Sequence, residues 1–135
     1  MLFFKRELTP VERFENALRD RRAERQKQAD RVSVAEALVE EKRAAAERLA
    51  VAGADDAKLA YAEAKLREVE ERAKTLRAQL AEFDQQVAST ERALAEATAQ
   101  RDRDRLADQI EEMALAIERA APGFGASATA LVEAV

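Results

Sequence analysis

The stretch from Leu66 to Ala97 reads LREVEERAKTLRAQLAEFDQQVASTERALAEA. Small or apolar side chains recur in it at alternating steps of three and four residues, with one Thr among them. They are Leu66, Val69, Ala73, Leu76, Leu80, Phe83, Val87, Thr90, Leu94 and Ala97. This spacing places all of them on one face of a helix and is typical of a coiled coil. The stretch therefore predicts a long helix whose apolar seam is covered by a partner helix.

A second helical pattern precedes this stretch and is weaker. Its seam positions are Phe14, Leu18, Val32, Ala35, Val39, Ala46 and Leu49. Polar side chains interrupt the seam in the middle, at Arg21, Arg25 and Gln28. Because the aliphatic stem of an arginine can lie along apolar surface, these residues are compatible with a packed helix. We therefore expect two helices that carry matching seams.

The two seams match when the chain folds back on itself. In an antiparallel hairpin the numbers of facing residues add up to a constant, and the seams agree best for a constant of about 108. Val39 then faces Val69, and Phe14 faces Leu94. We predict an all-α fold, a long antiparallel two-helix coiled-coil hairpin with short apolar helical ends.

Cap and breaker residues set the expected bounds of the helices. Thr9 and Pro10 form a helix start, and Glu12 completes a Thr-x-x-Glu capping box. Gly53 fits a helix C-cap, and the prolyl–glycyl pair at Pro122 fits a helix end. The expected organisation is an apolar N-terminal segment at 1–9 and a helical hairpin at 10–121, comprising a helix at 10–52, a turn at 53–56 and a helix at 57–121, followed by a C-terminal loop and short helix at 122–135.

The composition leaves little material for a pocket. The 135 residues include three Gly, two Pro, no Cys and no His, and Leu, Ile, Val and Phe together supply only 29 of them. Without His or Cys, the usual zinc sites, thiol nucleophiles and imidazole bases are excluded. We expect no enzyme activity, no cofactor, no metal and no small-molecule substrate.

The charges are balanced, with a formal net charge of −4 from 23 basic and 27 acidic side chains. This balance does not favour nucleic acid as a partner. A basic run at 19–31 lacks interleaved aromatic residues and surrounds its helix, so we expect it to be a solvated helix surface. The apolar start is too short for a secretory signal, and no stretch is long enough for a membrane span. A cytoplasmic location is expected.

Two adjacent acids, Asp55 and Asp56, lie at the predicted hairpin tip. A long hairpin with an acidic tip resembles the bacterial factors that enter the secondary channel of RNA polymerase. That resemblance implies an accessory factor of a nucleic-acid enzyme, whose tip carboxylates help to hold a catalytic Mg²⁺. The zinc-binding or globular body of such factors has no counterpart in this Cys-free chain. The other interpretation is that one of the two acids caps the second helix.

The N-terminal segment offers a membrane hypothesis. Phe3 and Phe4 precede two basic residues, Lys5 and Arg6, and such a segment can dip into a bilayer surface. Leu2, Phe3 and Phe4 together bury too little area to anchor a protein stably. Alternatively, the same apolar side chains can pack against the apolar residues of the second helix, which would bury them within the protein instead of in a membrane. A membrane-surface coat or remodelling element is therefore an alternative function.

Two apolar stripes on the second helix suggest self-association. The first is Leu76, Leu80, Phe83 and Val87, which face the polar interruption of the first helix. The second is Leu106, Ile110, Met113 and Ile117, which lie beyond the end of the first helix. Because a second copy of the chain would bury both stripes, we expect a homodimer or higher oligomer.

These observations favour interaction over catalysis. We expect a non-enzymatic, elongated coiled-coil scaffold, adaptor or assembly protein that contacts itself and a further protein partner. Long helical hairpins of this kind resemble export-apparatus stalk proteins, membrane-remodelling coat proteins and phage structural proteins. That resemblance is one of architecture and transfers no functional residue.

Overall fold

The computed structural model describes residues 5–134, and only the backbone of residues 124 and 126–129. It contains two helices, α1 over Pro10–Val51 and α2 over Asp56–Glu133, and no strand among the described residues. The predicted all-α hairpin is confirmed, because α1 packs against α2. The chain divides into two compact units. Unit 1, Met1–Leu94, contains α1 and the first part of α2, and unit 2, Ala95–Val135, contains the remainder of α2.

The start of α1 follows from its capping residues. Thr9 has extended backbone angles, and its Oγ1 accepts a hydrogen bond from the Glu12 backbone N–H over 3.1 Å. Pro10 occupies the first helical position, where a missing N–H costs nothing because no carbonyl precedes it in the helix. The Glu12 carboxylate accepts hydrogen bonds from the Thr9 hydroxyl and from Arg6. The predicted helix start at residue 10 is therefore confirmed.

The turn between the helices is a Schellman motif. The Gly53 N–H donates to the Ala50 carbonyl over 3.3 Å, and the Ala54 N–H donates to the Leu49 carbonyl over 3.1 Å. Gly53 has φ +68°, a conformation that a Cβ disfavours, so glycine suits this position. Asp55 then caps α2, because its Oδ1 accepts a hydrogen bond from the Lys58 N–H over 2.8 Å. The chain therefore reverses where the sequence predicts.

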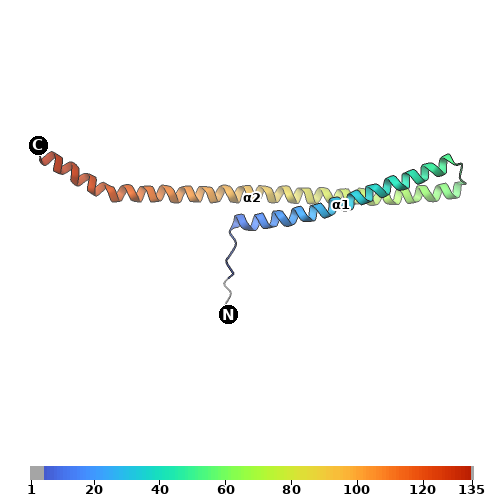
Figure 1. The fold of residues 1–135 in the computed structure, drawn as a ribbon, viewed down its shortest axis with the longest axis horizontal. Helices are drawn as coiled ribbons and strands as arrows, with labels where there is room; N and C mark the ends of the chain where they lie inside the picture. Colours follow the sequence, from blue (N-terminus) through green and yellow to red (C-terminus); the bar gives the residue numbers. More distant parts are fainter. Residues whose placement is uncertain (1–4, 135) are drawn as a thin grey trace. The chain divides into compact units, whose positions relative to one another are not determined.

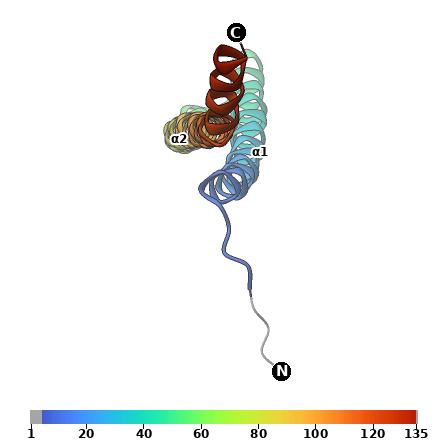
Figure 2. The same ribbon diagram turned by 90° about the vertical axis from the view of Figure 1, so that its left-hand side faces the viewer.

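The hairpin core is a narrow seam between α1 and the first part of α2, which lie side by side in both views (Figures 1 and 2). Its buried cluster combines Val32, Ala35, Val39, Ala73 and Leu76. The partly buried side chains that pack against this cluster are Leu66, Val69 and Leu80. These are seam positions of the two patterns, so the heptad spacing identifies the core residues.

Polar pairs across the seam define the register of the two helices. Arg25 Nε donates to Asp84 Oδ1 over 2.5 Å, and Arg21 Nη1 donates to Gln86 Oε1 over 2.9 Å. The residue numbers of these pairs add up to 109 and 107, against the constant of about 108 that an antiparallel hairpin with matched seams predicts. The expected pairing is therefore reproduced by contacts that played no part in predicting it.

Gln28 is buried at the seam, with only 3% of its surface exposed. Its Nε2 donates to the Leu76 carbonyl over 3.0 Å and to Gln79 Oε1 over 3.2 Å. Its Oε1 accepts a hydrogen bond from Arg31 over 3.2 Å. Among the described residues no buried side-chain nitrogen or oxygen lacks a partner. The middle of the seam is therefore closed by satisfied polar contacts.

The end of α2 differs from the prediction. The helix does not stop at residue 121 but passes through Pro122 and continues to Glu133, so the expected helix end at 121 and the loop expected to follow it within 122–135 are wrong. A proline inside a helix removes one hydrogen bond and clashes with the carbonyl four residues earlier, here that of Glu118. Bending relieves this clash, and Figure 1 shows α2 changing direction in its red-coloured part. Ala120 and Ala121 before Pro122 favour the helical state, whereas Gly123 and Gly125 after it disfavour it, so α2 continues against the local propensity of this short stretch.

Candidate functional site

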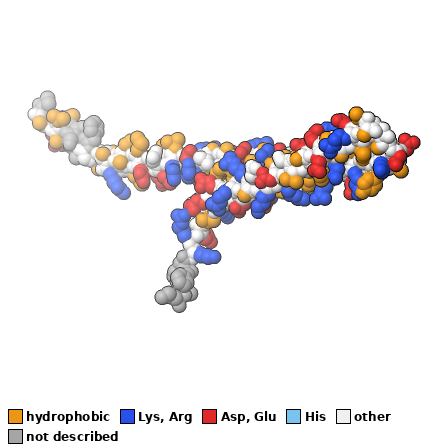
Figure 3. All heavy atoms as spheres, turned by 45° about the vertical axis from the view of Figure 1, so that its right-hand side comes forward, with side chains coloured by type: hydrophobic (Ala, Val, Ile, Leu, Met, Phe, Trp, Pro, Cys, Tyr) orange, Lys and Arg blue, Asp and Glu red, His pale blue; other side chains and the backbone are white. Residues whose placement is uncertain are grey.

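The most exposed apolar surface that the sequence predicted lies on α2 within unit 2. Its four large side chains form a row that we call the apolar stripe: Leu106, Ile110, Met113 and Ile117. Their exposed fractions are 56%, 59%, 65% and 68% in that order. Figure 3 shows hydrophobic side chains (orange) gathered along one edge of the part of α2 drawn at the left. No other described segment covers this stripe.

Small side chains widen the stripe on one flank. Ala107, Ala114 and Ala121 are seven residues apart, and all three are exposed. Ala107 directly follows Leu106, and Ala114 directly follows Met113. Ala121 follows residue 120, which is seven residues after Met113 and so has the same heptad position. Side chains without bulk let a neighbouring helix approach closely. The sequence interpretation missed this flank, although the seven-residue spacing of the alanines was a readable signal.

Charged side chains lie away from the stripe. The segment 106–118 carries four acidic residues and no basic one: Asp108, Glu111, Glu112 and Glu118. At 100° per residue, none of these positions coincides with the heptad positions of the stripe. The large apolar side chain Leu115 also lies outside the stripe, two residues before Ile117, and is 44% exposed. The helix is therefore amphipathic, with an uncharged face and an acidic face.

The other predicted interaction stripe lies inside the hairpin. Leu76 is buried in the core cluster, and Leu80, Phe83 and Val87 are half-buried. The sequence interpretation expected the facing part of α1 to cover these residues poorly. In the structure Leu76 packs with Val32, Ala35 and Val39 of α1, and the buried Gln28 amide bonds the Leu76 carbonyl. This stripe is a seam of unit 1, so the exposed stripe of unit 2 is the stronger candidate contact surface.

The predicted tip residues have a structural role. Asp55 caps α2 by accepting a hydrogen bond from the Lys58 N–H. Asp56 is the first residue of α2, where its negative charge interacts favourably with the positive end of the helix dipole. No group of three or more potential metal-ligating side chains occurs among the residues that the structure describes. The capping interpretation of the acidic tip is thus supported by a specific hydrogen bond.

The basic run at 19–31 also has structural partners. Besides the contacts of Arg21 and Arg25, Arg22 Nη2 pairs with Glu91 Oε1 across the hairpin over 3.1 Å. These side chains are 40–60% exposed, and ion pairs at such exposure each contribute little to stability. Their effect is to align α1 with α2, which agrees with the expected solvated helix surface.

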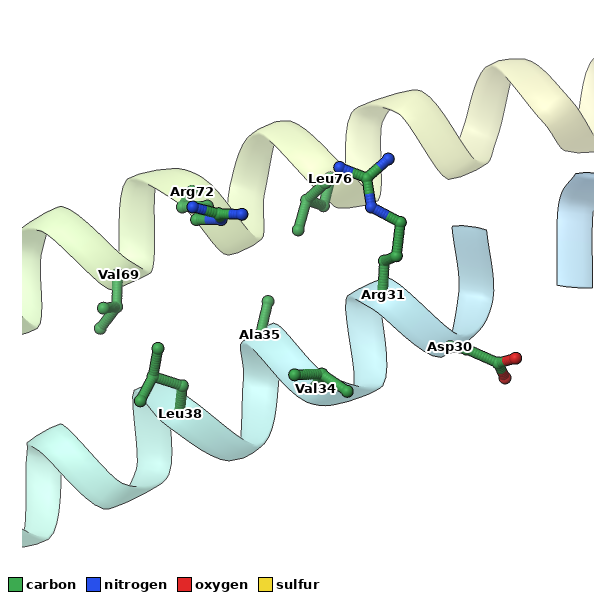
Figure 4. Close-up of a pocket in the computed structure, with 8 residues that line it drawn as sticks. All are labelled: Asp30, Arg31, Val34, Ala35, Leu38, Val69, Arg72 and Leu76. Atoms are coloured by element: carbon green, nitrogen blue, oxygen red, sulfur yellow. The ribbon is translucent and has the colours of Figure 1, made fainter. Parts of the chain in front are cut away.

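An open groove lies between α1 and α2 near the hairpin core, with a volume of about 480 Å³ (Figure 4). Val34, Ala35 and Leu38 line it from α1, and Val69 and Leu76 from α2. Val34 is 71% exposed at its rim. The eight lining residues also include Asp30, Arg31 and Arg72. Five of the eight lining residues are therefore apolar and three are charged.

The remaining N-terminal candidates, Phe3 and Phe4, lie outside the described residues. The membrane hypothesis that rests on them is therefore not tested. Of the described helices, neither has a segment with the length and apolar character that crossing a membrane requires.

Comparisons with protein-family models, with curated proteins and with solved structures found no match for this chain.

Proposed function

We propose that this protein is a non-enzymatic coiled-coil scaffold that acts through protein–protein contacts, and that its apolar stripe joins it to a second copy. The observation that carries the proposal is the exposure of Leu106, Ile110, Met113 and Ile117 on one helix face. The same spacing of apolar residues in unit 1 is covered by a partner helix.

The energetics favour a partner for the stripe. Complete burial of one Leu, Ile or Met side chain contributes roughly 1.5–3 kcal/mol, and each stripe residue is more than half exposed. Contiguous apolar patches on soluble proteins commonly mark interaction sites. The hairpin of unit 1 supplies the second requirement of a scaffold, a helical rod held in one register by polar contacts along its seam.

Sedimentation equilibrium at tens of micromolar tests this proposal, since it measures mass independently of shape. We expect the wild-type chain to sediment well above its monomer mass of 15.0 kDa. Replacing Ile110→Asp together with Ile117→Asp should return it to the monomer. Leu115→Asp is the control for position, because it places an aspartate on the same helix outside the stripe, and it is compared with Ile110→Asp alone as well as with the double variant.

A monomeric wild-type chain at these concentrations would contradict the proposal. An equal loss of mass in the Leu115→Asp control would also contradict it, because the effect would then not belong to the stripe. Circular dichroism of each variant should show that the hairpin remains helical, which excludes unfolding as the cause.

A further inference from the structure

The proposed contact can be given a geometry, which rests on the proposed function above. Arg103, Ile110 and Ile117 are seven residues apart and occupy one heptad position, called a. Leu106, Met113 and Ala120 are also seven apart and occupy the position three residues later, called d. We propose that residues 103–120 of α2 pair antiparallel with the same residues of a second copy, about a two-fold axis between residues 111 and 112.

The apolar side chains match in this arrangement. In an antiparallel pair of helices each a position faces a d position of the partner. With the axis between 111 and 112, Leu106 faces Ile117 of the second copy, and Ile110 faces Met113 of the second copy. All four stripe residues are then buried against stripe residues, and the contact is identical on both copies, as a two-fold interface requires.

Arg103 decides between the antiparallel and the parallel orientation. In a parallel pair, the same heptad position of both copies lies at the same level, so the two Arg103 guanidinium groups would meet at the interface. Like charges placed together at a buried position are unfavourable. In the antiparallel pair Arg103 faces Ala120, whose small side chain leaves room for the arginine stem. Arg103 then keeps its hydrogen bonds to Glu96 and Gln100 of its own helix.

The charge pattern explains why the partner is a second copy. The stripe and its alanine flank at Ala107, Ala114 and Ala121 carry no charge, so a partner face with charges would bury them unpaired. A complementary partner therefore presents an uncharged helix face with heptad spacing. The chain itself carries such a face over 106–117, with Arg103 at each end of the contact, and its acidic residues at 108, 111, 112 and 118 lie outside the contact.

Cysteine cross-linking tests the orientation cleanly, because the 135-residue chain has no cysteine of its own. An untagged Leu106→Cys chain and a tagged Ile117→Cys chain are mixed, oxidised and separated on a non-reducing gel. A disulfide forms when two Cα atoms approach within about 7 Å. In the antiparallel pair the two copies of residue 106 are about 16 Å apart along the helix, at 1.5 Å per residue. The expected product is the mixed disulfide between the two different chains.

A second pair of cysteine variants is needed because replacing the large stripe side chains with Cys can itself weaken the contact between the two copies. Arg103→Cys mixed with Ala120→Cys leaves all four stripe residues in place and should also give the mixed product. Sedimentation equilibrium of the reduced chains confirms that the association persists. Leu115→Cys, outside the stripe, is the control and should form no rapid cross-link.

The outcomes separate this inference from the proposed function. Cross-linking of Leu106→Cys to itself would show a parallel pair, and the antiparallel geometry would be overturned while the scaffold proposal stood. Absence of mixed product from both pairs, in a chain that still sediments as an oligomer, would overturn the geometry in the same way. A monomer by sedimentation would overturn both.

Discussion

Gln28 shows how one polar residue closes an otherwise apolar seam. A buried amide must find partners for its donors and its acceptor, and Gln28 finds Leu76 and Gln79 on α2 and Arg31 on its own helix. Such a residue favours the one register in which all these partners are present. The polar interruption that weakens the α1 seam in sequence is therefore part of the packing in the structure.

Replacing Gln28 with Ala should lower the free energy of unfolding of the hairpin by about 1–2 kcal/mol. The substitution deletes the interhelical hydrogen bonds and leaves a small void at a buried position. Gln26→Ala is the control, because Gln26 is exposed and its side chain bonds Asp30 of its own helix. Urea unfolding followed by circular dichroism measures both changes. A Gln28→Ala effect no larger than that of Gln26→Ala would show that the buried contacts contribute nothing.

Asp55 offers a second residue-scale test, which separates capping from a role for its charge. Asp55→Ala should destabilise the hairpin by about 1 kcal/mol through loss of the cap on the Lys58 N–H. Asp55→Asn should retain nearly all of the stability, because an amide oxygen caps about as well as a carboxylate. Thermal unfolding of the two variants provides the comparison. Equal destabilisation by both would mean that the negative charge, and not the cap geometry, matters at the tip.

At the scale of the elements, the hairpin was predictable because its signals are periodic or local. The heptad spacing of 66–97 identifies the seam, and Gly53 and Asp55 have short-range capping signatures that read directly from the sequence. The detailed cover of the seam was not predictable. Whether Arg25 and Gln28 project to solvent or bond α2 depends on which groups of the partner helix lie opposite, and the spacing does not specify this.

At the end of α2 the prediction from Pro122 is wrong, because one proline does not by itself end a helix. Pro122 removes one hydrogen bond, but every other backbone N–H of the segment can still bond four residues back. The alanines at 120–121 and at 126, 128 and 130 favour helix, and α2 continues to Glu133 despite Gly123 and Gly125 between them.

The apolar stripe of unit 2 is a different case. Its spacing is readable from the sequence, but only the structure shows that this stripe is exposed while the stripe at 76–87 is not.

Pro122→Ala tests the continuous helix. The substitution restores one hydrogen bond and removes a clash with the Glu118 carbonyl, which together are worth about 3 kcal/mol in a helix interior. Amide hydrogen exchange should therefore slow in the turns around residue 122 and stay unchanged in α1. If exchange after residue 122 stayed as fast as before, that part of the chain would not share one helix with the turns preceding it.

At the scale of the whole molecule, the two compact units differ in what stabilises them. Unit 1 buries an apolar seam between two helices of the same chain, so its stability is independent of protein concentration. The stripe of unit 2 has no intrachain cover among the described residues, and a helix segment without packing contacts gains little stability in water. Under the proposed self-association, unit 2 gains stability only from the second copy. Mass action then links its stability to protein concentration.

This difference predicts a thermal melt with a concentration-dependent part. Circular dichroism at about 5 and 100 μM should show an early loss of helix that shifts to higher temperature at the higher concentration, because binding stabilises the associated state. A later transition, from the hairpin of unit 1, should not shift. In the Ile110→Asp, Ile117→Asp variant the early loss should occur at the same low temperature at both concentrations. In Gln28→Ala only the later transition should move. If the whole melt of the wild-type chain were independent of concentration, unit 2 would be helical without a partner, and the physical basis of the proposed self-association would be removed.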